Sequence, residues 1–158
     1  MTTTGPIRTA IETDLAALGT LTEALDGMDE ALAEALDLIS EMSGRLIVTG
    51  LGKSGHIGAK LAATFASTGT PAYFLHPAEA SHGDLGMDHT DAVILALSWS
   101  GETRELSDVS GYAKRHSVSL VAITGSADST LARAANAALV LPKVREACPH
   151  NLAPTTST

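Results

Sequence analysis

Apolar residues recur in steps of three and four along the first 43 residues, which is the spacing of one helix face. The run is too long for one ordinary globular helix, so we expect a break at Gly19-Thr20 between a short first helix and a longer second one. Nine of the 18 acidic residues lie here against a single Arg8, which makes the opposite face acidic. The stripe is expected to face the core or, alternatively, a partner subunit. Its members are Ile7, Ile11, Leu15, Leu18, Leu21, Leu25, Met28, Leu32, Leu36, Ile39 and Met42.

From Arg45 onward, short apolar runs alternate with helical patterns. Strands that are apolar throughout are buried on both faces, which requires a parallel sheet covered by helices. We therefore predict an α/β fold with a five-stranded parallel sheet, whose ligands bind beyond the C-terminal strand ends, at loops 50–54, 76–86, 98–103 and 124–128. The predicted strands are 46–49, 72–75, 92–97, 120–124 and 138–141, and the predicted helices are 54–67, 102–115 and 128–135.

Composition excludes several classes of function. The formal net charge of -8 argues against a nucleic-acid partner, because clustered Lys and Arg drive binding to the phosphate backbone. The sequence has neither a membrane-spanning apolar run nor a signal-peptide pattern, so we expect a cytoplasmic location and no membrane partner. Cys148 is the one cysteine, which excludes an internal disulfide and a multi-cysteine zinc site.

Residues 46–58 contain an apolar strand followed by a glycine-rich turn and a helix. Glycines let a ligand approach the backbone closely, the first helical N–H groups can donate to phosphate oxygens, and Lys53 adds a positive charge. The segment 50–55 also matches the dinucleotide pattern G-x-G-x-x-G, but the second strand ends in Leu75-His76-Pro77 and lacks the acidic residue that binds ribose. Nucleotide binding and a purely structural turn remain alternatives.

The second candidate loop, Ser98-Trp99-Ser100-Gly101-Glu102-Thr103, follows the most apolar strand. Its three hydroxyls, its glycine and the helix N-terminus after it are typical of an anion site. Two such loops on adjacent strands could hold one phosphoester. Alternatively, Ser98 or Ser100 only caps the following helix.

Residues 45–158 resemble the sugar isomerase (SIS) domain of bacterial D-arabinose 5-phosphate isomerases, and the order and spacing of the shared motifs make the similarity specific. The motifs are Gly52-Lys53-Ser54-Gly55-His56-Ile57-Gly58, Phe65-Ala66-Ser67-Thr68-Gly69-Thr70-Pro71, His76-Pro77, Glu79-Ala80, His82-Gly83-Asp84-Leu85-Gly86, residues 98–103, Arg145-Glu146-Ala147-Cys148-Pro149 and residues 151–158.

The resemblance implies a three-layer αβα sandwich over residues 44–158, preceded by helices in residues 1–43 that pack on the core or on a partner subunit. It also implies interconversion of D-ribulose 5-phosphate and D-arabinose 5-phosphate in the supply of 3-deoxy-D-manno-octulosonate, by a homotetramer. Isomerisation through an enediol needs a base that moves a proton between C1 and C2, but no redox cofactor.

By the same resemblance, one group of residues would bind the phosphate and another would carry out the chemistry. The phosphate group comprises Gly52, Ser54, Ser98, Ser100, Gly101 and Thr103. The catalytic group comprises Lys53, Glu102, Glu146 and His82, with Glu146 or Glu102 as proton carrier, Lys53 neutralising the enediolate or phosphate, and His82 assisting ring opening or proton abstraction.

His76, His82 and Asp84 could gather a divalent metal, but the chemistry does not require one, and no physiological metal is expected. Relatives continue beyond this point with a helix and a further active-site histidine, often followed by regulatory CBS modules. The sequence thus resembles a truncated isomerase domain, in which we expect the phosphate site to survive and turnover to be weakened or lost. In addition, Trp99 stands where many relatives carry a small polar residue.

A non-catalytic sugar-phosphate sensor is the rival interpretation, because SIS domains also serve in transcription regulators. Lys53, Glu146 and His82 favour the enzyme, since a sensor needs a phosphate site but no base. The acidic N-terminal helices are also poor candidates for a DNA-binding partner domain.

Overall fold

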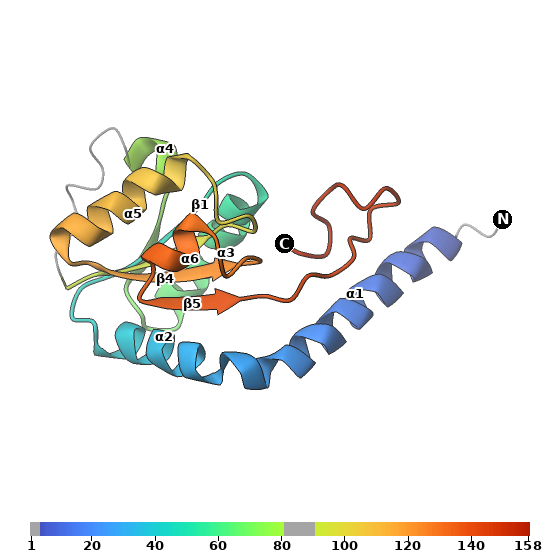
Figure 1. Ribbon diagram of the computed structural model, residues 1–158, viewed down its shortest axis with the longest axis horizontal. Coiled ribbons are helices and arrows are strands. Elements are labelled where there is room, and N and C mark those ends of the chain that lie inside the picture. Colours follow the sequence, from blue (N-terminus) through green and yellow to red (C-terminus); the bar gives the residue numbers. More distant parts are fainter. Residues whose placement is uncertain (1–3, 81–90) are drawn as a thin grey trace.

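The computed structural model describes residues 4–80 and 91–158 and contains one five-stranded, all-parallel sheet (Figure 1). The strands lie in the order β2-β1-β3-β4-β5. Each strand starts within one residue of its expected position, because uninterrupted apolar runs leave little choice of register. The predicted five-stranded parallel sheet is therefore confirmed. The strands are β1 (Leu46–Gly50), β2 (Ala72–Leu75), β3 (Val93–Leu97), β4 (Ser119–Thr124) and β5 (Ala137–Val140).

Helices cover both faces of this sheet, which confirms the three-layer arrangement. α2 (Asp29–Glu41) and α3 (Lys53–Ser67) pack on one face, and α4 (Pro77–Ala80), α5 (Glu105–His116) and α6 (Thr130–Ala134) on the other. Alternate residues of β1 enter opposite layers of the core: Val48 packs with the α2 and α3 side chains, and Ile47 with those of α5 and α6.

The expected break at Gly19-Thr20 is wrong. α1 (Gly5–Ala24) runs through both residues, and the chain bends instead in the 3₁₀ turn η1 (Leu25–Met28). A glycine inside a helix costs only about 1 kcal/mol relative to alanine, so Gly19 does not end the helix. The helix expected from residue 102 also begins later, at Glu105, because residues 98–103 form a separate loop.

The N-terminal helix and the segment after β5 lie beside each other, although the two termini are far apart (Figure 1). α1 extends from the body of the molecule, and the segment after β5 runs beside it (Figure 1). The Thr156 hydroxyl donates to Asp14 Oδ1 over 2.7 Å and joins the two segments. No residue of α1 is buried, so its apolar stripe does not face the core of this chain. Among the described residues, no helix is long and apolar enough to cross a membrane.

The strand order also places the candidate ligand site. β2 lies on one side of β1 and β3 on the other, so the chain changes direction of winding between β1 and β3. The loops that leave these two strands diverge, and the resulting crevice at their C-terminal ends is the common binding place of such sheets.

Candidate functional site

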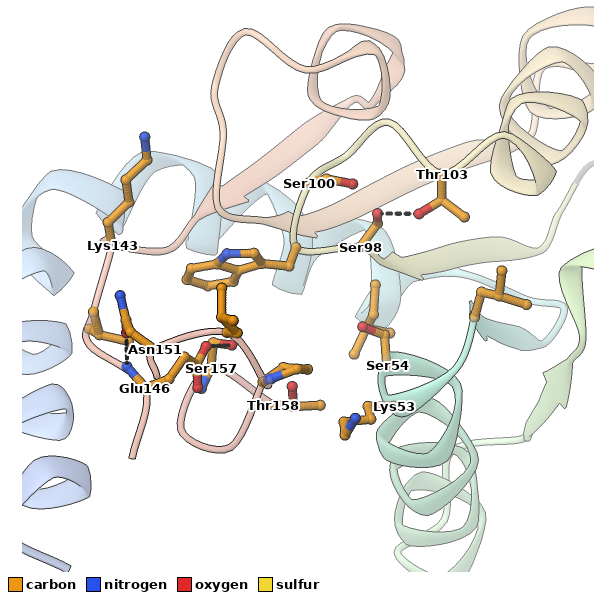
Figure 2. Close-up of a pocket in the computed structure, with 16 residues that line it drawn as sticks. Lys53, Ser54, Ser98, Ser100, Thr103, Lys143, Glu146, Asn151, Ser157 and Thr158 are labelled. Carbon is orange, nitrogen blue, oxygen red and sulfur yellow. Dashed lines mark hydrogen bonds between the residues drawn. The ribbon is translucent and has the colours of Figure 1, made fainter. Parts of the chain in front are cut away.

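A cavity of about 710 Å³ opens at this crevice, within the roughly 300–1,000 Å³ typical of small-molecule sites. In Figure 2, Ser54, Ser98 and Thr103 lie on one side of the open space, and Glu146, Asn151 and Ser157 on the other. Its lining comes from the β1–α3 turn, the β3–α5 loop and the segment after β5: Leu51, Lys53, Ser54, Leu97, Ser98, Trp99, Ser100, Thr103, Lys143, Val144, Glu146, Asn151, Leu152, Pro154, Ser157 and Thr158.

The N-terminus of α3 forms one wall. Gly52 precedes the helix with φ +59°, a conformation that favours glycine, and Lys53 and Ser54 form the first turn. Gly55 lies so close to β1 that a Cβ there would be 2.6 Å from the Gly50 carbonyl oxygen. The turn therefore brings the positive end of the helix dipole and an exposed Lys53 ammonium to the cavity, where both favour an anion.

The facing loop, residues 98–103, is called the hydroxyl loop below. The Ser98 and Thr103 hydroxyls lie 2.8 Å apart, and the Ser98 Oγ also accepts from the Gly101 N–H at 3.1 Å. The Ser100 Oγ accepts from the Glu102 N–H at 3.2 Å. Because only one hydroxyl of the Ser98–Thr103 pair donates to the other, the second proton is available to an anion. The alternative in which Ser98 or Ser100 caps the following helix is wrong, because α5 begins only at Glu105 and no side chain caps it. Both hydroxyls instead accept from N–H groups within the loop.

Glu146 occupies a nest of donors from the last residues of the chain. Its Oε2 accepts from the N–H groups of Thr155 and Thr156, both at 2.7 Å, and of Ser157 at 3.3 Å, while the Ser157 hydroxyl donates to Oε1. Partial burial alone would raise the pKa of Glu146, but these donors outweigh it and lower the pKa to about 2. The carboxylate is therefore ionised over the whole physiological range.

The two carboxylates proposed as proton carriers are separated by the fold. Glu146 lines the cavity, whereas Glu102 lies outside the lining and binds Thr130. The geometry thus brings Lys53, Ser54, Ser98, Ser100, Thr103 and Glu146 together and leaves Glu102 apart.

The histidine predictions reach only partly into the described structure. His82 and Asp84 lie outside the described residues, so the role of His82 and the His76–His82–Asp84 metal site stay predictions. His76 is exposed, and its Nδ1 accepts from the Ala78 N–H at 3.3 Å at the start of α4. Within residues 4–80 and 91–158, no three acidic, histidine or cysteine side chains gather as metal ligands.

Sequence reasoning missed four polar residues of the cavity as candidates: Lys143, Asn151, Ser157 and Thr158. Lys143 follows the last strand, and the rule that ligands bind beyond strand ends could have selected it. Asn151 accepts from the Glu146 N–H at 2.7 Å through its Oδ1, and Ser157 binds the carboxylate itself. Both belong to the C-terminal motif, but nothing in their spacing indicates that they would surround Glu146.

Comparison with known proteins identifies relatives of this chain. The chain is 50% identical over 140 residues to the arabinose 5-phosphate isomerase KdsD of Pseudomonas aeruginosa, covering 84% of this chain and 43% of the relative. It is 46% identical over 158 residues to KdsD of Francisella tularensis, covering 98% and 48%. The chain therefore spans less than half the length of these curated relatives.

Among solved structures, the Escherichia coli CFT073 protein c3406 in complex with arabinose 5-phosphate superimposes with a TM-score of 0.89 at 37% identity, covering 99% of this chain and 84% of that one. The Vibrio vulnificus NanR protein complexed with ManNAc-6P shares the fold at a TM-score of 0.72 and 18% identity, covering 90% and 52%. The SIS domain family matches residues 38–158. The chain belongs to the SIS domain family.

Proposed function

We propose that this domain interconverts D-ribulose 5-phosphate and D-arabinose 5-phosphate through an enediol. The observation that carries the proposal is the cavity, which places an anion-binding wall, a lysine and a carboxylate around one space of suitable size. Similarity to the protein solved with arabinose 5-phosphate, and to two arabinose 5-phosphate isomerases, supports the choice of sugar.

The phosphate would lie between the N-terminus of α3 and the hydroxyl loop. Ser54, Ser98, Ser100 and Thr103 offer short donors there, and Gly52 and Gly101 give the two loops their shape. Both glycines have positive φ, at +59° and +65°. A dianionic phosphate in this place gains charge-assisted hydrogen bonds, which are about twice as strong as neutral ones.

Lys53 and Glu146 would act on the sugar carbons and oxygens. The Lys53 ammonium, exposed at the rim, can neutralise the enediolate oxygen or the phosphate. Glu146 remains the candidate proton carrier because it lines the cavity. With a pKa of about 2 it is a weak base in its present contacts, so proton transfer requires the release of some of its N–H bonds. His82 would assist ring opening or proton abstraction.

The direct test is turnover. The chain is incubated with arabinose 5-phosphate in D₂O, and two quantities are measured: the ribulose 5-phosphate formed and the deuterium at C2 of the recovered arabinose 5-phosphate. Isomerisation through an enediol exchanges that proton with solvent. Binding of the sugar phosphate without any exchange at C2 would instead identify a sensor. A chain that shows neither binding nor exchange would refute both the isomerase and the sensor interpretation.

Arabinose 5-phosphate, the product, would be the precursor from which 3-deoxy-D-manno-octulosonate of lipopolysaccharide or capsule is made. Because phosphorylated sugars do not cross membranes unaided, this role requires a cytoplasmic location. The reaction moves a proton and needs neither a redox cofactor nor a metal. The net charge of -8 again disfavours nucleic acid as a partner.

The same proposal includes a homo-oligomer, a tetramer by resemblance, in which α1 packs on another subunit. The α1 side chains Ile7, Ile11, Leu15 and Leu18 are between 55% and 63% exposed. Burying a leucine or isoleucine is worth roughly 1.5–3 kcal/mol, so a partner that covers this stripe gains substantially. Light scattering should give a mass several times the 16.2 kDa of one chain. Leu15→Glu should lower this mass, whereas the control Glu23→Lys, on the polar face of the helix, should not. A monomeric unsubstituted chain would refute this part.

A further inference from the structure

We propose that Glu102 is a positioning residue that fastens the hydroxyl loop to the start of α6, and that it does not carry protons in the reaction. The inference rests on the proposed function, in which this loop binds the phosphate of the substrate. It assigns to Glu102 a contact 28 residues along the chain in place of a contact with the sugar.

Both carboxylate oxygens of Glu102 are engaged by one residue. Oε1 accepts from the Thr130 N–H at 2.7 Å, and Oε2 accepts from the Thr130 hydroxyl at 2.8 Å. Thr130 is the first residue of α6, so its N–H has no acceptor within that helix. The Thr130 N–H and then its hydroxyl lower the pKa of Glu102, which keeps the carboxylate ionised and therefore able only to accept.

The neighbouring residues of the hydroxyl loop are attached to the same segment. The Leu131 N–H donates to the Gly101 carbonyl oxygen at 3.0 Å, and the Gly125 N–H donates to the Trp99 carbonyl oxygen at 2.9 Å. A Cβ at Gly101 would lie 2.1 Å from the Ser129 Oγ. One side of the loop is thus fixed against residues 124–131.

The other side of the loop presents its hydroxyls to the cavity. Ser98, Ser100 and Thr103 line it, and Figure 2 shows the bonded Ser98–Thr103 pair. Glu102 connects the two sides, because its backbone N–H donates to the Ser100 Oγ while its side chain binds Thr130. The Glu102–Thr130 contact therefore links the Ser100 hydroxyl to the start of α6 and helps to hold it where a phosphate would bind.

Substitution by glutamine separates the two possible roles of Glu102. A glutamine keeps one carbonyl oxygen for the Thr130 N–H and can donate its amide to the Thr130 oxygen, so it preserves the contact but cannot take up a proton. Alanine removes both. Thr130→Val deletes only the hydroxyl, and Thr130→Ser, which retains it, is the matched control.

The test measures the dissociation constant of inorganic phosphate by calorimetry and, separately, kcat and KM for arabinose 5-phosphate. We expect Glu102→Ala to weaken phosphate binding and raise KM roughly tenfold, the loss of one charge-assisted contact. Glu102→Gln should keep most of the phosphate affinity that Glu102→Ala loses. Thr130→Val, combined with Glu102→Ala, should weaken phosphate binding little further. Thermal unfolding of each variant establishes that it is folded.

Two results would overturn the inference: unchanged phosphate affinity in Glu102→Ala, or a fall in kcat of about 100-fold or more in Glu102→Gln with phosphate affinity intact. If the unsubstituted chain binds phosphate but shows no turnover, the isomerase proposal fails, while the phosphate affinities still decide the role of Glu102. Turnover without measurable phosphate binding by the unsubstituted chain would overturn the inference alone.

Discussion

Alanine at Gly101 should destabilise the protein more than alanine at Gly52, although both glycines have a positive φ. Their φ angles are +65° and +59°. A Cβ at Gly52 would meet no atom within 4 Å, whereas at Gly101 it would lie 2.1 Å from Oγ and 2.3 Å from Cβ of Ser129, and 2.9 Å from the Thr124 Oγ1. Ser129 and Thr124 are buried and cannot turn away into solvent.

The magnitude of the difference follows from these contacts. Both variants place an alanine at a positive φ, in conformations that cost a residue other than glycine roughly 1–3 kcal/mol. Overpacking against buried neighbours adds about 1–3 kcal/mol at Gly101 alone. The gain from a less flexible unfolded chain is the same in both and cancels. For a domain of this size each kcal/mol shifts the midpoint by roughly 2–4 °C, so the overpacking by itself should lower the unfolding midpoint of Gly101→Ala by about 2–12 °C.

The assay is reversible unfolding of both variants, by heat and by urea, followed by circular dichroism. Similar slopes in urea would show that the same surface is exposed on unfolding, which makes the free energies comparable. Equal free energies of unfolding would refute the reasoning, because they would mean that the hydroxyl loop moves away from Ser129 without a cost.

Three further predictions concern the cavity and the C-terminal segment that forms part of its wall. The depressed pKa of Glu146 stabilises the folded chain, and this stabilisation is fully present above the unfolded pKa of 4.5. Lowering the pH from about 4.5 through 2 should therefore remove it. Free energies of unfolding measured against pH should fall less for Glu146→Gln than for the unsubstituted chain. Asp14→Ala should increase hydrogen exchange at residues 155–157, because Thr156 loses its partner on α1, and Asp14→Asn should restore protection; no change in Asp14→Ala would contradict this link. Lys53→Ala should lower kcat about 100-fold or more with little change in thermal stability, because the side chain is exposed, and full activity would refute its proposed role.

Much of the fold could be predicted because it depends on local patterns. The runs at 46–48 and 92–97 are apolar without interruption, and such strands are stable only in the middle of a covered parallel sheet. The bend in the N-terminal helices could not be located in this way. A single glycine disfavours a helix too weakly to end it, and the bend falls at η1, after which α2 packs against the sheet.

The sequence alone was enough to predict that loops 50–54 and 98–103 meet at the site, since parallel strands bring their C-terminal ends to one edge and the residues after β1 and β3 are rich in glycine and donors. Loop 124–128, predicted at the same edge, does not line the cavity, and the segment after β5 does. Only the tertiary structure decided what the two carboxylates contact. Glu102 belongs to the hydroxyl loop, yet binds Thr130 at the start of a later helix, whereas Glu146, far along the chain, lines the cavity. The direction of a side chain depends on the donors that the fold brings within reach, and here those donors lie between 9 and 28 residues away in sequence.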